Sequence, residues 1–257
     1  ECGIKTVVTS RAFMEKRPFE PDDAKLVYLE DLAQQVSFFD KLVGGYQAKF
    51  CSPEKLDRIH DLNSIQPEDL LTIIFTSGST GNPKGVKLSN RNVSSNIAAV
   101  NELFHITEKD VILGVLPFFH SFGYTGTLWL TMSLEASSVY HFNPLDSRTV
   151  GTLSDEHDVS IILATPTFLR SYMRRCTPEQ MHHLDLVIVG AEKLPKDLAE
   201  QFKEKFGVEP TEGYGTTELS PVASMNVPDH RASEGADPGT RLGTVGKVAP
   251  GSEIKVV

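Results

Sequence analysis

Apolar segments of strand length alternate with helical segments from Leu70 onward, and this alternation is the strongest constraint on the fold. It predicts an α/β protein with layered parallel sheets, flanked on both faces by helices and connected by right-handed crossovers. The expected strands are 70–75, 111–116, 138–142, 159–164, 184–189 and 208–212. Two shorter strands, 7–10 and 24–29, precede them, and residues 30–60 are expected to be partly helical.

Local signals place the helices between these strands. Ser89 or Asn90 and Ser147 are expected to cap helices, and Pro166 and Pro195 to open them. After Pro228 the chain turns polar and rich in glycine, and residues 243–257 have the pattern of a β-hairpin region. We therefore expect the start of a small β-subdomain at the C-terminal end.

The run Thr76–Gly85 directly follows the apolar segment 70–75, which we interpret as a buried strand. Its hydroxyls and glycines favour phosphate binding, because backbone N–H groups and side-chain hydroxyls can approach phosphate oxygens closely. Lys84 adds a mobile cation suited to a polyphosphate. The order of residues differs from a Walker A loop, in which Gly-Lys-Ser/Thr opens a helix. The alternative is a solvated Ser/Gly surface loop, but the ordered run predicts binding of a nucleoside triphosphate.

Four polar or glycine-rich loops follow apolar runs, namely 76–85, 117–123, 190–194 and 213–218. In open α/β sheets, ligands bind beyond the carboxyl ends of the strands. Because all four loops are expected at that edge, the sequence predicts one binding site there.

Composition excludes several other classes of function. The chain has 257 residues, 40% apolar and 23% charged, which is typical of one large or two smaller globular domains. Its net charge is −9, which argues against nucleic acid as the main partner. No apolar run has the length of a membrane span, and the start lacks the pattern of a signal peptide. Cys2, Cys51 and Cys176 lack metal-site spacing and indicate a reducing compartment.

Five motifs together resemble those of the adenylate-forming superfamily, which includes acyl-CoA ligases, luciferases and adenylation domains. The resemblance covers the chain from about Leu70 onward. Within it, 189–194 and 221–228 are most similar to the acyl-[acyl-carrier-protein] synthetase part of bacterial 2-acylglycerophosphoethanolamine acyltransferase/synthetase proteins. The five motifs are Thr76-Ser-Gly-Ser-Thr-Gly-Asn-Pro-Lys-Gly85, Pro117-Phe-Phe-His-Ser-Phe-Gly123, Gly190-Ala-Glu-Lys-Leu194, Glu212-Gly-Tyr-Gly-Thr-Thr-Glu218 and Gly243-Thr-Val-Gly-Lys-Val-Ala-Pro-Gly251.

The resemblance implies a two-step reaction with ATP and Mg²⁺. A carboxylate, which we expect to be a fatty acid, attacks the α-phosphate, and a phosphopantetheine thiol of coenzyme A or of an acyl carrier protein then takes the acyl group. Catalysis of the first step must rest on positioning and charge neutralisation. The residues implied to grip the β- and γ-phosphates are Thr76, Ser77, Gly78, Ser79, Thr80, Gly81 and Lys84.

The remaining site residues are also implied by the resemblance. Glu218 matches the magnesium ligand and Thr217 the residue that bonds the α-phosphate, while Tyr214 would stack on adenine. His120 matches the histidine beside the carboxylate tunnel; we assign it positioning or gating, because a fatty carboxylate is already ionised at neutral pH. The other implied nucleotide-binding residues are Gly190, Ala191, Glu192, Glu212, Gly213, Gly215 and Thr216.

Each of these residues has a plainer interpretation when it is taken alone. Glu218 could be a helix cap, Tyr214 a core residue at a strand end, and Glu192 a solvated turn acid. The acyl chain would lie along an apolar cluster that could equally be ordinary core. That cluster comprises Phe118, Phe119, Phe122, Tyr124, Thr165, Pro166 and Leu169. The pair His182-His183 is expected on the surface.

The resemblance also predicts how the chain divides. Residues 1–95 would end a first α/β subdomain, 96–230 form a second, and 231–257 begin the β-subdomain. The family's longer N-terminal part and its C-terminal lysine-bearing domain are expected outside this segment, so the segment alone should form little or no acyl-adenylate. We expect a location at the cytoplasmic side of the membrane. The alternative function is a non-catalytic nucleotide- or acyl-binding module.

Overall fold

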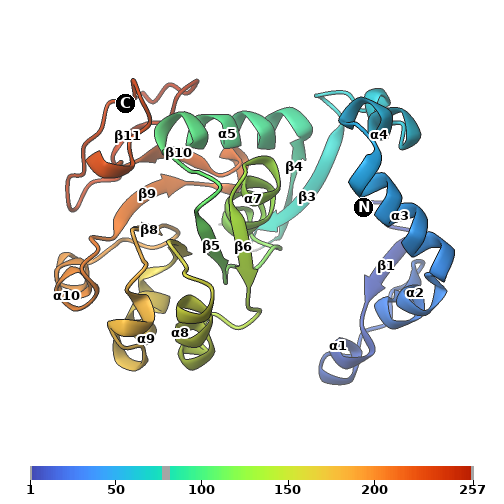
Figure 1. Cartoon of the computed structure of the whole chain (residues 1–257), viewed down its shortest axis with the longest axis horizontal. Coiled ribbons are helices and arrows are strands. Elements are labelled where there is room, and N and C mark those ends of the chain that lie inside the picture. The colour runs from blue at the N-terminus through green and yellow to red at the C-terminus, as the bar shows by residue number, and fades with distance from the viewer. Residues whose placement is uncertain (1, 77–81, 256–257) are drawn as a thin grey trace. The chain divides into compact units, whose positions relative to one another are not determined.

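The computed structural model describes residues 2–76 and 82–255, and these form two compact units that meet in sequence between Ile65 and Gln66 (Figure 1). The predicted boundaries at 95/96 and 230/231 stay predictions. The phosphate-loop residues 77–81 lie outside the described residues.

The first unit combines a small sheet with short helices. Strands β1 and β2 pair in parallel, with Thr6 opposite Lys25 and Thr9 opposite Tyr28. This confirms the two short strands and the partly helical character predicted for this region. Its elements are β1 (Thr6–Thr9), α1 (Arg11–Lys16), β2 (Lys25–Tyr28), α2 (Leu29–Gln35), α3 (Phe38–Phe50), α4 (Pro53–Ile59) and the 3₁₀ turn η1 (Leu62–Ser64).

The second unit contains the alternating strands and helices. Its first part comprises β3 (Leu70–Thr76), β4 (Lys84–Ser89), α5 (Asn90–Leu103), β5 (Val111–Gly114), α6 (Ser121–Gly123), the π-helical turn η2 (Tyr124–Trp129), α7 (Leu130–Ser133) and β6 (Ser137–Tyr140). Its second part comprises α8 (Ser147–Glu156), β7 (Ile161–Ala164), α9 (Pro166–Arg175), η3 (Glu179–Met181), β8 (Leu186–Val189), α10 (Lys196–Phe206), β9 (Thr211–Gly215), η4 (Thr217–Leu219), β10 (Val222–Met225), η5 (Asp229–Arg231) and β11 (Lys247–Val248).

The main sheet of this unit has seven strands in the described residues, in the order β11-β10-β9-β8-β7-β5-β6. The five strands from β6 to β9 are parallel, and β10 and β11 join the edge antiparallel. The predicted α/β fold with a mostly parallel sheet is therefore confirmed.

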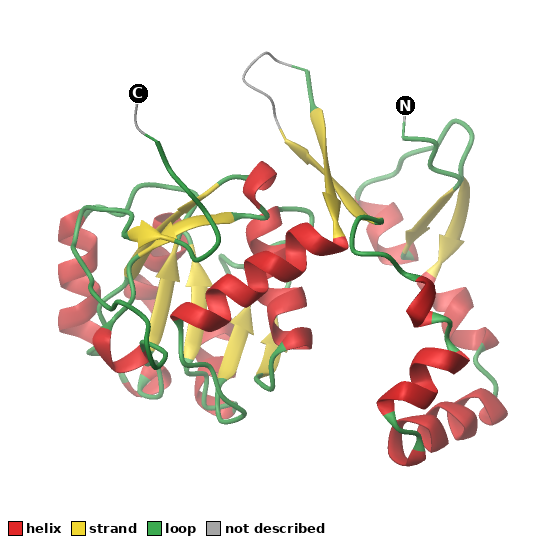
Figure 2. Cartoon of the chain, turned by 90° about the horizontal axis from the view of Figure 1, so that it is seen from above, coloured by secondary structure: helices red, strands yellow, loops and turns green. Residues whose placement is uncertain are grey.

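Successive residues of the parallel strands face two different cores. Ile112, Ile161 and Ile188 pack with α5 on one face of the sheet. Leu113, Ile162 and their equivalents on β8 pack with α8, α9 and α10 on the other (Figure 2). Because both faces are covered, the strands read as continuous apolar runs rather than as alternating ones.

The helix boundaries follow the local signals at Ser89 and Pro166, whereas Pro195 is the N-cap of α10 rather than its first residue, which is Lys196. Ser89 caps α5 in a capping box with Asn92, Pro166 begins α9, and Gly207 ends α10 at a φ of 81°. The predicted cap at Ser147 is wrong: Asp146 is the N-cap of α8, because its carboxylate accepts the Thr149 N–H.

Two predicted strand features differ from the structure. β3 pairs antiparallel with β4 in a separate hairpin, so it is not the fully buried strand that we expected. Only one face of such a hairpin packs on the core, which buries Ile74 and leaves Phe75 54% exposed. In the described part of 243–257, β11 is the strand that forms, and its partner is β10 rather than a second strand of the same segment.

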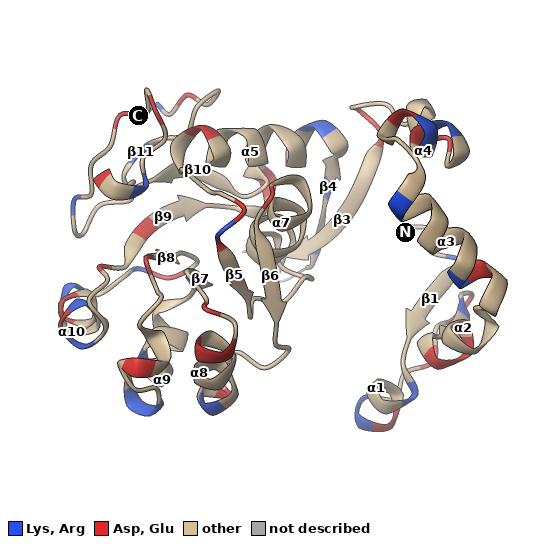
Figure 3. Cartoon of the chain, in the orientation of Figure 1, with Lys and Arg blue, Asp and Glu red and all other residues tan. Residues whose placement is uncertain are grey.

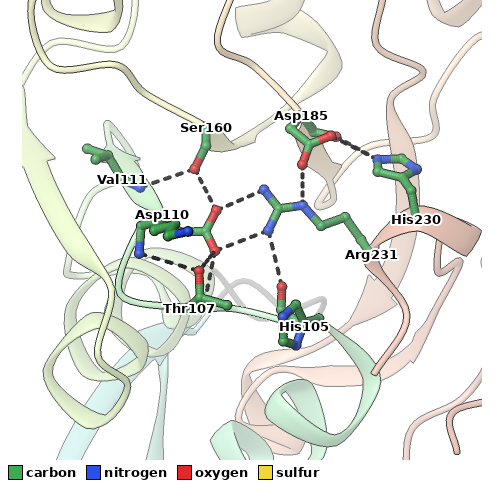
Figure 4. A network of polar contacts seen from close by, with 9 residues as sticks. His105, Thr107, Asp110, Val111, Ser160, Asp185, His230 and Arg231 are labelled. Atoms are coloured by element: carbon green, nitrogen blue, oxygen red, sulfur yellow. Dashed lines mark hydrogen bonds and ion pairs between the residues drawn. The ribbon is translucent and has the colours of Figure 1, made fainter. Parts of the chain in front are cut away.

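A buried polar network joins the amino ends of three adjacent strands (Figure 4). Asp110 precedes β5 and Asp185 precedes β8, and Arg231 contacts both. The Arg231 guanidinium donates to the two Asp110 oxygens at 2.8 and 3.1 Å, and its Nε lies 2.6 Å from Asp185. Ser160, which precedes β7, donates to Asp110 at 2.8 Å. The network thus fixes the edge of the sheet opposite the predicted site.

The outer surface carries both signs of charge. α8 and α10 contain both acidic and basic residues, whereas the charged residues of α9 are all arginines (Figure 3). Among the helices that the structure describes, none is long and apolar enough to cross a membrane.

Candidate functional site

A cavity of about 630 Å³ lies where β5, β8 and β9 end at their carboxyl edges. All four predicted loops contribute to its wall through their described residues. The loop residues in the wall are Thr76, Lys84, Phe119, His120, Ser121, Phe122, Gly190, Ala191, Gly213, Tyr214, Gly215, Thr216, Thr217 and Glu218. The predicted convergence of these loops is therefore present in the folded chain.

The β3–β4 hairpin supplies a hydroxyl and a cation to the cavity. Thr76 ends β3 and Lys84 begins β4, so the two are cross-strand partners at the end of the hairpin that precedes and follows the phosphate loop in sequence, and both line the cavity. Lys84 forms no ion pair with any carboxylate of the described residues. Its charge is therefore available to an anionic ligand in the cavity.

The turn after β9 carries Thr217 and Glu218 in opposite environments. The Thr217 hydroxyl is buried and accepts a hydrogen bond from Ser121 at 3.3 Å. Glu218 is exposed on the cavity wall, and no ion pair holds it within the part of the chain that the structure describes. One residue is thus held by an internal hydrogen bond, while the next leaves an exposed carboxylate on the cavity wall.

His120 is placed as a neutral hydrogen-bonding group. It caps the short helix α6, where the Phe122 N–H donates to its Nδ1 at 3.3 Å. Partial burial of the ring lowers the pKa of His120 below its ordinary value. Because Nδ1 accepts, the neutral ring carries its proton on Nε2, which is left as the donor.

Small residues on the other walls bring the backbone close to the cavity. A Cβ on Gly215 would lie 2.0 Å from the Pro221 carbonyl oxygen, so only glycine fits there. A Cβ on Gly190 would lie 3.2 Å from the Phe122 ring. Ala191 has a φ of 66°, in the left-handed region. Tyr214, which lines the same cavity, is 50% exposed, and its ring offers a face for stacking.

Two predicted nucleotide-binding acids do not line this cavity. Glu212 is buried, and its carboxylate accepts the Leu194 N–H at 3.1 Å. It joins the loop after β8 to β9 and so supports the cavity wall from behind. Glu192 is exposed and accepts the Thr167 hydroxyl at 2.8 Å. It therefore lies in the polar turn environment that was the plainer interpretation of this residue.

The predicted acyl-binding cluster is divided by the sheet. Phe119 and Phe122 line the cavity, but Leu169 is fully buried in the core on the α9 side. Phe118 packs edge-on against Tyr140 at a ring distance of 5.5 Å. The assignment of Leu169 to an acyl path is wrong, because its helical spacing marks the face of α9 that packs on the sheet.

The donor set fits a magnesium ion that is bound mainly through a ligand's phosphates. Glu218 is a hard carboxylate on the cavity wall, with the Thr76 and Thr217 hydroxyls on the same wall. In the described residues, no group of three or more His, Cys, Asp or Glu side chains could form a cage of protein ligands. Magnesium commonly takes one or two carboxylates together with phosphate oxygens and waters, which this arrangement permits.

The sequence analysis assigned no role to two residues whose hydrogen bonds support the site. Ser121 belongs to the motif at 117–123, but its bond to Thr217 joins positions 96 residues apart. Asn96 is a buried amide on the apolar face of α5, three residues after Val93 and one before Ile97. A polar residue inside an apolar helical stripe was the available signal for Asn96.

The fold and the cavity define an α/β protein with a cavity at the carboxyl edge of a parallel sheet. The chain belongs to the AMP-binding enzyme family, whose model matches residues 1–257. The fold is that of the N-terminal domain of adenylate-forming enzymes.

Individual relatives agree with this assignment. A medium-chain-fatty-acid–CoA ligase of Ectopseudomonas oleovorans is 30% identical over 77% of this chain and 38% of its own length. The structure of ATP-bound MatB from Rhodopseudomonas palustris is 28% identical, with a TM-score of 0.63 over 72% of this chain and 35% of that one. For the fold alone, MenE from Bacillus subtilis gives a TM-score of 0.72 at 23% identity, covering 98% of this chain and 46% of that one.

The chain spans between about a third and a half of the length of the curated relatives that it matches.

Proposed function

We propose that this chain is the central part of an ATP-dependent, AMP-forming acyl ligase. In the first step, an oxygen of the substrate carboxylate forms a bond to the α-phosphorus of ATP, and pyrophosphate leaves. In the second step, a thiol sulfur attacks the acyl carbonyl, its proton is lost, and AMP leaves. Overall, the reaction converts ATP, the carboxylic acid and the thiol into AMP, pyrophosphate and the thioester.

The observation that carries the proposal is the convergence of Thr76, Lys84, Thr217 and Glu218 on one cavity. The first step brings an anionic nucleophile to an anionic phosphate, so it needs cations and donors fixed in advance. Lys84 supplies a positive charge toward the β- and γ-phosphates, and the hydroxyls of Thr76 and Thr217 supply donors. Glu218 would hold Mg²⁺, which neutralises phosphate charge when it is bound.

His120 and Tyr214 complete the assignment on chemical grounds. The lowered pKa keeps His120 neutral at neutral pH, so its Nε2–H can orient a carboxylate oxygen without adding a charge. Tyr214 is half-exposed and lines the same cavity as Gly190 and Ala191, so its ring offers a stacking face to a flat base. These positions favour nucleotide and carboxylate binding in a single cavity.

We infer a fatty acid as the carboxylate and coenzyme A or an acyl carrier protein as the acceptor. The E. oleovorans relative is named as a medium-chain-fatty-acid–CoA ligase, which favours the fatty acid and coenzyme A. The resemblance of 189–194 and 221–228 to acyl-[acyl-carrier-protein] synthetases favours the carrier protein and a place at the cytoplasmic side of the membrane.

The test is ATP–pyrophosphate exchange by the intact protein, measured with a series of fatty acids and with aryl and dicarboxylic acids. We expect exchange that depends on a fatty acid, followed by thioester formation when coenzyme A or holo-carrier protein is added. Binding of ATP without exchange for any acid would instead support the alternative, a non-catalytic nucleotide-binding module.

A further inference from the structure

Asn96 of α5 binds the backbone of the turn that follows Glu218. Its Nδ2 donates to the Leu219 carbonyl oxygen at 3.2 Å and to the Val222 carbonyl oxygen at 2.9 Å. The Val222 N–H donates in return to Asn96 Oδ1 at 3.2 Å. One buried side chain thus holds both ends of the segment 219–222, which lies more than 120 residues away in sequence.

The regular pairing of β9 with β10 is interrupted in this segment. The pairing of β9 with β10 shifts register between Val222 and Ser224, and Ser220 has a φ of 70°. Within the turn, the Leu219 N–H bonds to the Thr216 carbonyl and the Ser220 N–H to the Thr217 carbonyl. The Pro221 carbonyl accepts the Thr216 N–H where β10 begins to pair with β9, and the two amide hydrogens of Asn96 satisfy the carbonyls of Leu219 and Val222 on either side of it.

The placement of Asn96 relates it directly to the candidate metal ligand. Glu218 precedes Leu219, whose carbonyl Asn96 binds, and Val222 lies on the cavity wall together with Glu218. Asn96 itself does not line the cavity. It also sits among buried apolar residues of α5, which anchors the amide to the core. The contacts therefore run from the core through Asn96 to the turn that presents the carboxylate.

We propose that Asn96 is a positioning residue that holds the turn 217–222 so that Glu218 faces the phosphates of ATP. This inference rests on the proposed function. A pure packing role is a poor explanation, because an apolar residue would fill the same place without the desolvation of an amide. The three bonds orient the amide uniquely, since two carbonyls require the donor side and one N–H requires the acceptor side.

The main test is a double-mutant cycle with Asn96→Ala and Glu218→Gln in the intact protein. If Asn96 acts through Glu218, Asn96→Ala should lower the exchange rate about tenfold or more and raise the Mg²⁺ concentration needed for half-maximal rate. On the Glu218→Gln background, the same change should cost less than about twofold. Asn101→Ala, an exposed position on the same helix, is the matched control and should change neither quantity.

Different outcomes separate this inference from the proposed function. Absence of exchange in the unmodified protein would refute the proposed function. Exchange that needs Glu218 but is unaffected by Asn96→Ala, or equal losses on both backgrounds, would refute the role of Asn96 alone. If Asn96→Ala does not fold, hydrogen exchange on the unmodified protein decides: we expect the Val222 amide to be protected, and more so with Mg²⁺ and ATP. An unprotected Val222 amide, or protection that ATP with Mg²⁺ does not increase, would overturn the proposal.

Discussion

The Ser121 hydroxyl donates a hydrogen bond to the Thr217 hydroxyl across 3.3 Å, and both side chains are buried. The bond joins the loop after β5 to the turn after β9, so two of the four cavity loops are tied by a single contact. Because the Thr217 hydroxyl accepts from Ser121, its own proton remains free to be donated to a phosphate oxygen.

Replacing Ser121 by Ala should therefore reduce the rate of adenylation more than it reduces the stability of the folded protein. The lost bond is worth about 0.5–1.5 kcal/mol, which corresponds to about a two- to tenfold lower rate of adenylation. The measurement is carboxylate-dependent pyrophosphate exchange, together with thermal unfolding. Ser133→Ala, at an exposed position of α7, is the control. An unchanged exchange rate in Ser121→Ala would show that the contact does not position Thr217.

Lys84→Ala should weaken the binding of ATP more than the binding of AMP. The lysine is the first residue of β4 and lines the cavity, where its charge would meet the β- and γ-phosphates that AMP lacks. A charge-assisted contact of this kind is worth about 1.5–3 kcal/mol. Isothermal titration with both nucleotides measures the difference, and Lys87→Ala on the same strand should leave both affinities unchanged. Equal losses for ATP and AMP would remove Lys84 from the phosphate grip.

The sequence predicted the strands and helices well wherever a local pattern determines them. The proline at the start of α9 and the capping serine of α5 are each predicted from a few neighbouring residues. The convergence of the cavity loops was also predictable, because parallel strands bring their carboxyl ends to one edge.

What failed depends on contacts between distant residues. β3 is partly exposed because it pairs with β4 in a separate two-stranded hairpin instead of joining the main sheet. Leu169 and Phe122 are both large apolar residues and were predicted to belong to one acyl-binding cluster, yet they lie on opposite faces of the sheet. Asn96 and Ser121 have their partners 96 or more residues away; the sequence marks Asn96 as a polar residue on an apolar helix face, but it does not identify the partner of either residue.

Acid should destabilise the protein partly through Asp110. Burial acts to raise the pKa of Asp110, but hydrogen bonds from Arg231, the Thr107 N–H and Ser160 outweigh it and hold that pKa below its ordinary value. The contribution of Asp110 to stability is therefore complete above the unfolded-state pKa of about 3.9, and it is lost as the pH falls through the lower folded-state pKa.

The free energy of unfolding of Asp110→Asn should be lower at pH 7, because Arg231 loses its buried partner; such losses are about 3–5 kcal/mol. Below about pH 4 the same variant should lose stability less steeply than the unmodified protein. Denaturant titrations at a series of pH values measure both effects. Asp155→Asn, on the exposed side of α8, is the control. A parallel decline in Asp110→Asn and the unmodified protein would contradict the assignment.

The central claim, adenylation of a carboxylate in this cavity with Glu218 as the metal ligand, is tested most directly by Glu218→Gln. The measurement is fatty-acid-dependent ATP–pyrophosphate exchange by the intact protein, with Glu204→Gln on the exposed face of α10 as the control. Glutamine keeps the shape of the side chain but loses the charge that a hard cation requires. The account predicts a rate about 10²–10³-fold lower in Glu218→Gln, with an unchanged unfolding transition. Exchange close to that of the unmodified protein would contradict it.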